Sequence, residues 1–133
     1  MARVIHFEIT ADKPERAVRF YEQALGWRIE PWGGPSPYWL VSTDAEVESG
    51  IDGAIRDRAG AGQSTINTVS VPNLEASIES VRRAGGAVVG EIQLIPEVGR
   101  FVYVADTEGN RFGLMETMPQ ATVPDLGPGP RVV

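Results

Sequence analysis

Cysteine is absent from this sequence of 133 residues, and histidine occurs once, at His6. The absence of cysteine excludes disulfide bonds, thiolate metal sites and a cysteine nucleophile. No Gly-rich phosphate loop, Ser-His-Asp arrangement or nucleotide-binding fingerprint appears in the sequence. These absences remove several common enzyme mechanisms at once.

Positive charge and long apolar runs are also scarce. The sequence contains 12 Lys and Arg residues and 18 Asp and Glu residues. The resulting net charge of −6 opposes binding to a phosphate backbone. No apolar run approaches the ~20 residues that span a bilayer, and no signal peptide precedes the first expected strand. With 42% hydrophobic and 23% charged residues, the composition is that of one globular domain. We therefore expect a cytoplasmic protein whose partner is a small molecule, with no nucleic acid and no membrane.

The main positive feature is an internal repeat. Residues 5–30 recur when the sequence is shifted by 60 positions, with matching pairs Ile9/Val69, Ala24/Ala84, Gly26/Gly86 and Ile29/Val89. Self-similarity at a fixed spacing indicates a duplicated structural unit. The sequence therefore predicts two modules of the same architecture.

The first module is expected at residues 4–56. Residues 4–10 alternate apolar and polar side chains, which predicts a strand with His6 and Glu8 on one face. A helix follows, with Asp12 as N-cap, Pro14 in its first turn, Glu15 completing a capping box, and Gly26 as its end. The other strands expected in this module are residues 27–32, 38–43 and 50–55.

The second module is expected at residues 64–117, after a linker at 57–63. It repeats the pattern with a helix that Asn73 caps and Gly85 and Gly86 end. Its expected strands are residues 65–71, 87–95, 99–105 and 110–117. Residues 118–133 hold four prolines and two glycines without apolar periodicity, which predicts an extended or disordered tail. The predicted class is α+β, with two tandem βαβββ modules.

Three groups of residues in this order resemble the vicinal oxygen chelate superfamily, which includes glyoxalase I, extradiol dioxygenases, fosfomycin-resistance enzymes and bleomycin-binding proteins. They are His6, the segment Phe20-Tyr21 with Leu25-Gly26-Trp27, and Asp106-Thr107-Glu108-Gly109-Asn110. The resemblance covers residues 4–117. It implies curled mixed sheets around a cavity, the glyoxalase/bleomycin resistance fold, and commonly a homodimer.

The resemblance also implies a divalent metal bound by four residues of the two modules. Its first ligand position is His6, and the other three fall at about Gly53, Ile66 and Gly113. Those three residues have no donor side chain, whereas a catalytic metal needs three or four converging N or O donors. Only a two-ligand site of His6 and Glu8 remains conceivable. We therefore expect no cofactor and no metal ligands.

His6 and Glu8 remain candidate catalytic residues. His6 is either an inherited residue of the cavity that hydrogen-bonds to Glu8 or backbone, or a general base or donor to a ligand. A carboxylate such as Glu8 inside the cavity of a curled sheet must find a hydrogen-bonding or charged partner, or its pKa must shift.

Aromatic residues are the candidate ligand-binding groups. Trp32, Tyr38 and Trp39 cluster within eight residues and are either core or a stacking surface for a flat ligand. Strand alternation places Tyr38 and Trp39 on opposite faces. Arg100 could bind a polar substituent, or form a solvated pair with Glu97. The full candidate set is Trp32, Tyr38, Trp39, Ile66, Thr68, Arg100, Tyr103, Gly113 and Met115.

Two functions follow from these observations. The first is metal-independent binding of a small apolar or aromatic molecule, because apolar residues at the ligand positions create an apolar slot. The alternative is an enzyme, either a glyoxalase-type lyase or isomerase, or a metal-free acid–base catalyst that uses His6 and Glu8. A partner-binding accessory protein with a vestigial cavity is a third possibility.

Overall fold

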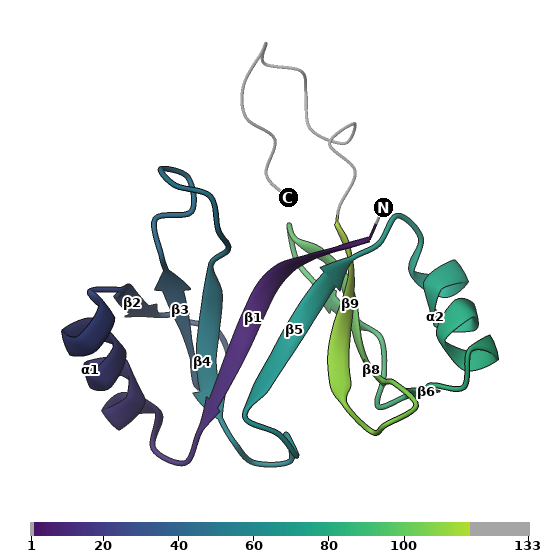
Figure 1. Ribbon diagram of the computed structural model, residues 1–133, viewed down its shortest axis with the longest axis horizontal. Coiled ribbons are helices and arrows are strands. Elements are labelled where there is room, and N and C mark those ends of the chain that lie inside the picture. The colour runs from purple at the N-terminus through teal and green to yellow at the C-terminus, as the bar shows by residue number, and fades with distance from the viewer. Residues whose placement is uncertain (1, 118–133) are drawn as a thin grey trace, which may run out of the picture. The chain divides into compact units, whose positions relative to one another are not determined.

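The computed structural model of the chain describes residues 2–117 (Figure 1). They form two compact units, of which the first spans residues 4–68 and the second begins at Val69. The boundary falls inside strand β5 (Thr65–Ser70). The tail predicted at 118–133 lies outside the described residues. Within 2–117, no helix is long and apolar enough to cross a membrane.

The first unit contains a mixed sheet in the order β2–β3–β4–β1. Strand β1 (Arg3–Ala11) runs parallel to β4 (Gly53–Asp57), and Glu8 lies beside Ala54. Strand β3 (Tyr38–Ser42) is antiparallel to both β4 and β2 (Arg28–Pro31). This register fixes which side chains share a face of the sheet.

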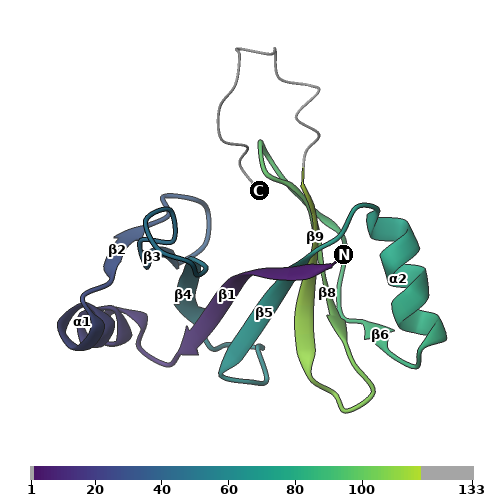
Figure 2. The ribbon, with the colours of Figure 1, turned by 45° about the horizontal axis from the view of Figure 1, so that its top comes forward.

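Helix α1 (Pro14–Leu25) covers one face of this sheet (Figures 1 and 2). The core beneath it is built on the buried side chains of Ala11, Val41 and Ile55. The helix ends where Gly26 adopts a left-handed conformation with φ 70° and donates its N–H to the Glu22 carbonyl. The predicted helix end at Gly26 is confirmed.

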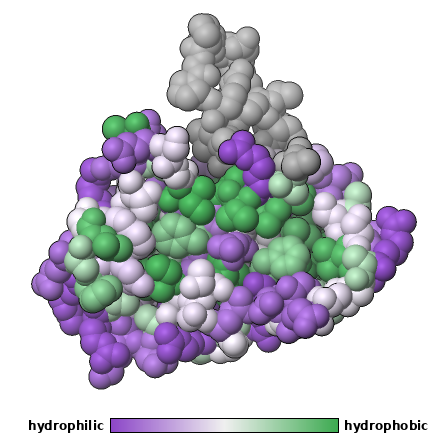
Figure 3. Space-filling view, in the orientation of Figure 1, coloured by the Kyte–Doolittle hydropathy of each residue, from purple (hydrophilic) through white to green (hydrophobic). Residues whose placement is uncertain are grey.

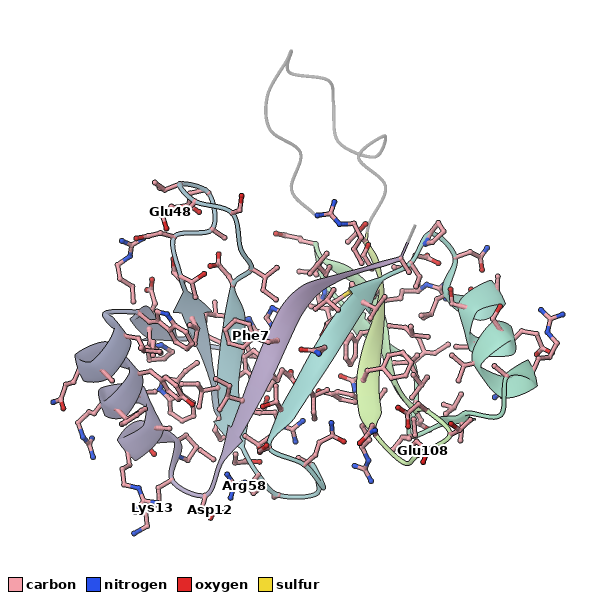
Figure 4. The ribbon with its side chains drawn as sticks, viewed as in Figure 1. Phe7, Asp12, Lys13, Glu48, Arg58 and Glu108 are labelled. Carbon is pink, nitrogen blue, oxygen red and sulfur yellow. The ribbon has the colours of Figure 1, made fainter. Side chains whose placement is uncertain are left out.

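The capping box predicted from Asp12 and Glu15 is wrong. Lys13 is the N-cap residue, and its side chain makes no capping hydrogen bond. The Asp12 carboxylate instead pairs with the Arg58 guanidinium, at 3.2 Å between Oδ2 and NH1. Figure 4 shows Asp12, Lys13 and Arg58 together at the end of β1. Arg58 also donates to the Thr10 carbonyl at 3.0 Å, so the aspartate is held away from the helix amides.

The second unit repeats the arrangement. Helix α2 (Leu74–Arg83) begins after Asn73, whose side chain accepts a 2.9 Å hydrogen bond from the Ala76 N–H, which confirms the predicted cap. The helix ends one residue before the predicted glycine pair, with Ala84 as C-cap. Strands β8 (Gly99–Ala105) and β9 (Arg111–Thr117) are antiparallel. Their side chains pack under α2 in a core that contains Val102, Val104 and Leu114.

The single strand predicted at residues 87–95 is wrong. Two short strands, β6 (Ala87–Val88) and β7 (Gln93–Ile95), pair separately with β8. Gly90 lies between them with φ 146°, a conformation outside the range of β-strands, and interrupts the ladder. The turn predicted before β9 is confirmed, since Gly109 has φ 81° and donates its N–H to the Asp106 carbonyl.

Candidate functional site on the helix-free face of the first sheet

The sheet of the first unit has two chemically different faces. The face toward α1 carries apolar side chains, including Phe7, Val41 and Trp39. Because side chains alternate along a strand, His6, Glu8 and Tyr38 belong to the other face. We call this the helix-free face.

On the helix-free face, Tyr38 connects Glu8 and His6. The Tyr38 hydroxyl donates to Glu8 Oε2 at 2.7 Å. The hydroxyl oxygen of Tyr38 also lies 3.2 Å from His6 Nε2. The period-two pattern of residues 4–10 predicted the face of His6 and Glu8, and the structure adds that Tyr38 reaches both from β3.

Glu8 also faces a cation that the sequence reasoning missed. Its side chain is buried, at 5% exposure for the residue, and Oε1 lies 3.7 Å from NH1 of Arg56. Arg56 is directly opposite Tyr38 across β3 and β4. The strand was predicted to end at Ile55, but β4 continues to Asp57. The signal that could have found Arg56 is its position two residues after Ala54, the neighbour of Glu8.

The environment of His6 keeps its imidazole neutral. Burial lowers the pKa of His6 below its ordinary 6.5, because the charged form loses its hydration. The negative charges of Glu8 and Asp52 act in the opposite direction but do not overcome this effect. A neutral imidazole has one donor and one acceptor nitrogen. His6 can therefore accept a hydrogen bond or a proton at neutral pH.

Asp52 is a second residue near His6 that the sequence reasoning missed. Its Oδ1 accepts hydrogen bonds from the Thr43 N–H at 2.8 Å and from the Thr43 hydroxyl at 3.0 Å. These bonds hold the loop between β3 and β4 and occupy the carboxylate oxygen that faces Thr43. Asp52 therefore acts on His6 as a fixed negative charge.

The residues present do not fit the divalent metal that the family resemblance implies. In the described part of the chain, no three His, Asp or Glu residues group as metal ligands. The ligand position placed at Gly53 also requires correction, since a side chain there would meet Phe7, with a Cβ 2.5 Å from its ring. The residue of β4 beside Glu8 is Ala54, which has no donor atom.

The predicted aromatic residues divide between the two faces. The Trp32 ring packs edge-on against Tyr38, with centroids 5.6 Å apart, and Trp32 is 42% exposed. Leu40, two residues from Tyr38, is also 42% exposed. Figure 3 shows hydrophobic residues in green among hydrophilic residues in purple on the side of the molecule in view. Trp39 instead packs in the core beneath α1. The structure thus brings Trp32 and Tyr38 together and places Trp39 on the opposite face.

The other predicted ligand-binding residues lie on strand β5, which pairs with β1, and in the second unit. Ile66 and Thr68 in β5 are buried, at 1% and 3% exposure. In the second unit, Tyr103 lies opposite Gly113 on β8 and β9. Met115 alternates with Leu114, which packs under α2, so Tyr103, Gly113 and Met115 share the face that turns away from that helix.

Arg100 belongs to β8, and its side chain lies on the face of that strand opposite to Tyr103. There it contacts the first turn of α2. It donates two 2.7 Å hydrogen bonds to Glu75, and its NH2 lies 3.1 and 3.2 Å from the two carboxylate oxygens of Glu116. Glu116 in turn accepts the Leu74 N–H at 2.7 Å, which satisfies an amide at the start of the helix. The expected partner Glu97 is replaced by Glu75 and Glu116. These contacts indicate that Arg100 stabilises the second unit.

With one helix on one face of each sheet, the units define the α+β glyoxalase/bleomycin resistance fold. The fold matches a superfamily member from Vibrio splendidus with a TM-score of 0.65 at 14% identity, covering 89% of this chain and 100% of the other. It also matches methylmalonyl-CoA epimerase from Mycobacterium tuberculosis with a TM-score of 0.63 at 16% identity, covering 90% of each chain. The predicted fold class is confirmed.

The chain belongs to the glyoxalase-like domain family, whose model matches residues 6–115. It is 32% identical over 110 residues to a glyoxylase-like domain-containing protein of Didymella fabae, covering 77% of this chain and 84% of the relative. It is 30% identical over 116 residues to the putative glyoxylase CFP32 of Mycobacterium bovis, covering 85% of this chain. The match spans only 43% of that mycobacterial protein. The resemblance to the vicinal oxygen chelate superfamily is thereby confirmed.

Proposed function

We propose that this glyoxalase-like protein binds a small apolar or aromatic molecule on the helix-free face of its first unit, without a catalytic metal. The observation that carries the proposal is the hydrogen bond from Tyr38 to Glu8, beside the exposed Trp32 ring. The Glu8 carboxylate, which with His6 could form only a two-ligand metal site, accepts a hydrogen bond from the Tyr38 hydroxyl and lies beside the Arg56 guanidinium. An aromatic ring next to a few fixed polar groups is typical of sites that bind flat organic molecules.

The pairing of Glu8 supports a binding role for this face. A buried carboxylate without partners is strongly unfavourable, so the Tyr38 and Arg56 contacts stabilise Glu8 in place. Moving Glu8 to a metal ion or a substrate proton would break both contacts. Glu8 therefore orients Tyr38 and Arg56, and the residues that contact the ligand are Trp32, Leu40 and His6.

One observation favours a second candidate, a metal-free acid–base enzyme. The neutral imidazole of His6 lies beside the Tyr38 hydroxyl, and an imidazole with an open nitrogen can accept a substrate proton. The mycobacterial relative is named a putative glyoxylase, which agrees with a lyase or isomerase activity. Replacing His6 by Ala separates the candidates. A binder loses at most about tenfold in affinity, whereas an acid–base enzyme loses about 10²-fold or more in rate.

Native mass spectrometry of the purified protein tests the first proposal. We expect a mass that includes a small organic molecule, lost on denaturation, and no stoichiometric metal ion. One divalent ion per chain that survives dialysis and leaves with chelator would contradict the proposal. The same spectrum measures whether the chain forms the homodimer that the family resemblance implies.

A further inference from the structure

The hydrogen bonds around Tyr38 fix the tautomer of His6. An ionised carboxylate only accepts, so the proton of the Tyr38 hydroxyl points to Glu8 Oε2. The hydroxyl oxygen can then only accept from His6 Nε2, 3.2 Å away. Nε2 of a neutral His6 therefore carries the proton, and Nδ1 has the free lone pair.

Arg56 holds this arrangement from the opposite side of Glu8. Its NH1 lies 3.7 Å from Glu8 Oε1, and its Nε donates to the Asp57 carbonyl at 3.1 Å. A guanidinium can only donate, so the Glu8 oxygen that faces it is also an acceptor. Because Glu8 stays an acceptor, the direction of both hydrogen bonds through Tyr38 cannot reverse.

The lone pair of Nδ1 is open to a ligand. In the part of the chain that the structure describes, His6 makes a single hydrogen bond, through Nε2. Among the same residues, no buried side-chain nitrogen or oxygen lacks a hydrogen-bond partner. Nδ1 has no such partner, so it is not completely buried. A molecule on the helix-free face can therefore bring a donor to it.

We propose that His6 Nδ1 selects ligands that carry an O–H or N–H donor on a planar aromatic ring, with Tyr38 as the positioning residue that holds the tautomer. The proposal rests on the binding function above and names its ligand class. Trp32, whose ring packs against Tyr38, offers the apolar contact for the ring of such a ligand. A phenol or a heteroaromatic N–H compound satisfies both requirements, whereas an aryl ether satisfies only the apolar one.

The tautomer is tested by NMR of ¹⁵N-labelled protein. Because His6 is the only histidine, its two ring nitrogens are assigned without ambiguity. We expect the Nε2–H form in the wild type and a mixture of tautomers in Tyr38→Phe. Tyr21→Phe, which makes the same chemical change in the ring stacked on Trp27, is the control and should leave the wild-type signals. An Nδ1–H form in the wild type overturns the proposal.

Ligand choice is tested with 2-naphthol and 2-methoxynaphthalene, which differ in the donor. By calorimetry we expect the wild type to bind 2-naphthol about tenfold more tightly, as one hydrogen bond allows. His6→Ala and Tyr38→Phe should reduce this preference, and Tyr21→Phe should keep it. Equal affinity for both probes in the wild type overturns the donor selection but leaves the binding function standing. Binding of neither probe at millimolar concentration overturns both.

Discussion

The Tyr38 hydroxyl donates a 2.7 Å hydrogen bond to the Glu8 carboxylate, across strand β4, which separates their strands. Glu8→Ala removes the carboxylate that accepts this hydroxyl and faces the Arg56 guanidinium. We expect the free energy of unfolding to fall by about 2–3 kcal/mol, as for other buried polar groups that lose a partner. Urea unfolding measures it. Glu30→Ala, at an exposed position of β2, is the control and should cost less than about 0.5 kcal/mol. Equal losses in the two variants would show that the Glu8 contacts contribute little.

Trp39 and Trp32 should respond differently to truncation. Trp39 packs in the core beneath α1, so Trp39→Ala should lower the free energy of unfolding by about 3 kcal/mol. Trp32 is 42% exposed, so Trp32→Ala should cost about 1 kcal/mol or less but weaken 2-naphthol binding. Unfolding and calorimetry on both variants measure this. If Trp32→Ala left the affinity unchanged, Trp32 would not contact the ligand.

The two helix starts provide a matched pair of variants. Asn73→Ala removes a side-chain cap of α2 and should lower the free energy of unfolding by about 1 kcal/mol. Lys13→Ala changes the N-cap residue of α1, which makes no capping hydrogen bond, and should have almost no effect. Thermal unfolding compares the two. A larger loss for Lys13→Ala would mean that the assignment of the caps is wrong.

Stability should fall in acid because of the ion pairs at the start of α2. The hydrogen bond from Arg100 lowers the pKa of Glu75 from 4.5 to about 2. The pKa of Glu116 is also lowered, first by the Leu74 N–H and then by Arg100. Because the folded pKa is the lower one, this stabilisation is complete above pH 4.5 and is lost as the pH falls toward 2.

Arg100→Met provides the test of this pH dependence. Between pH 5 and pH 3, roughly the window set by these pKa shifts, its urea midpoint should fall less than that of the wild type. NMR titration of the Glu75 carboxyl should show its pKa returning toward 4.5 in the variant. If the urea midpoints of the wild type and of Arg100→Met fell equally between pH 5 and pH 3, the pairing of Arg100 with Glu75 and Glu116 would not contribute to the acid sensitivity.

The sequence predicted the module order because periodicity and breakers are local signals. His6 and Glu8 alternate with apolar residues, Asn73 precedes an amphipathic helix, and Gly109 sits in a turn. The failures involve contacts that local patterns do not encode. Asp12 is a residue type that commonly caps helices, but Arg58, which is distant in the sequence, binds its carboxylate.

The candidate site was predicted in part for the same reason. The shared face of His6 and Glu8 follows from alternation, and so does the separation of Tyr38 from Trp39. Which polar groups meet depends on strand register, which places Arg56 opposite Tyr38 and Ala54 beside Glu8. The first pair is 18 positions apart in the sequence and the second is 46 apart, and neither pairing has a signature within one strand.

Metal-independent binding on the helix-free face is the central claim, and calorimetry of 2-naphthol before and after dialysis against chelator tests it most directly. We expect the same Kd in both samples, with no change when Zn²⁺, Ni²⁺ or Mn²⁺ is added back, because neither Trp32 nor His6 Nδ1 requires an ion to contact the ligand. Loss of binding after chelation that one equivalent of metal restores would contradict the account and give His6 and Glu8 the role of metal ligands.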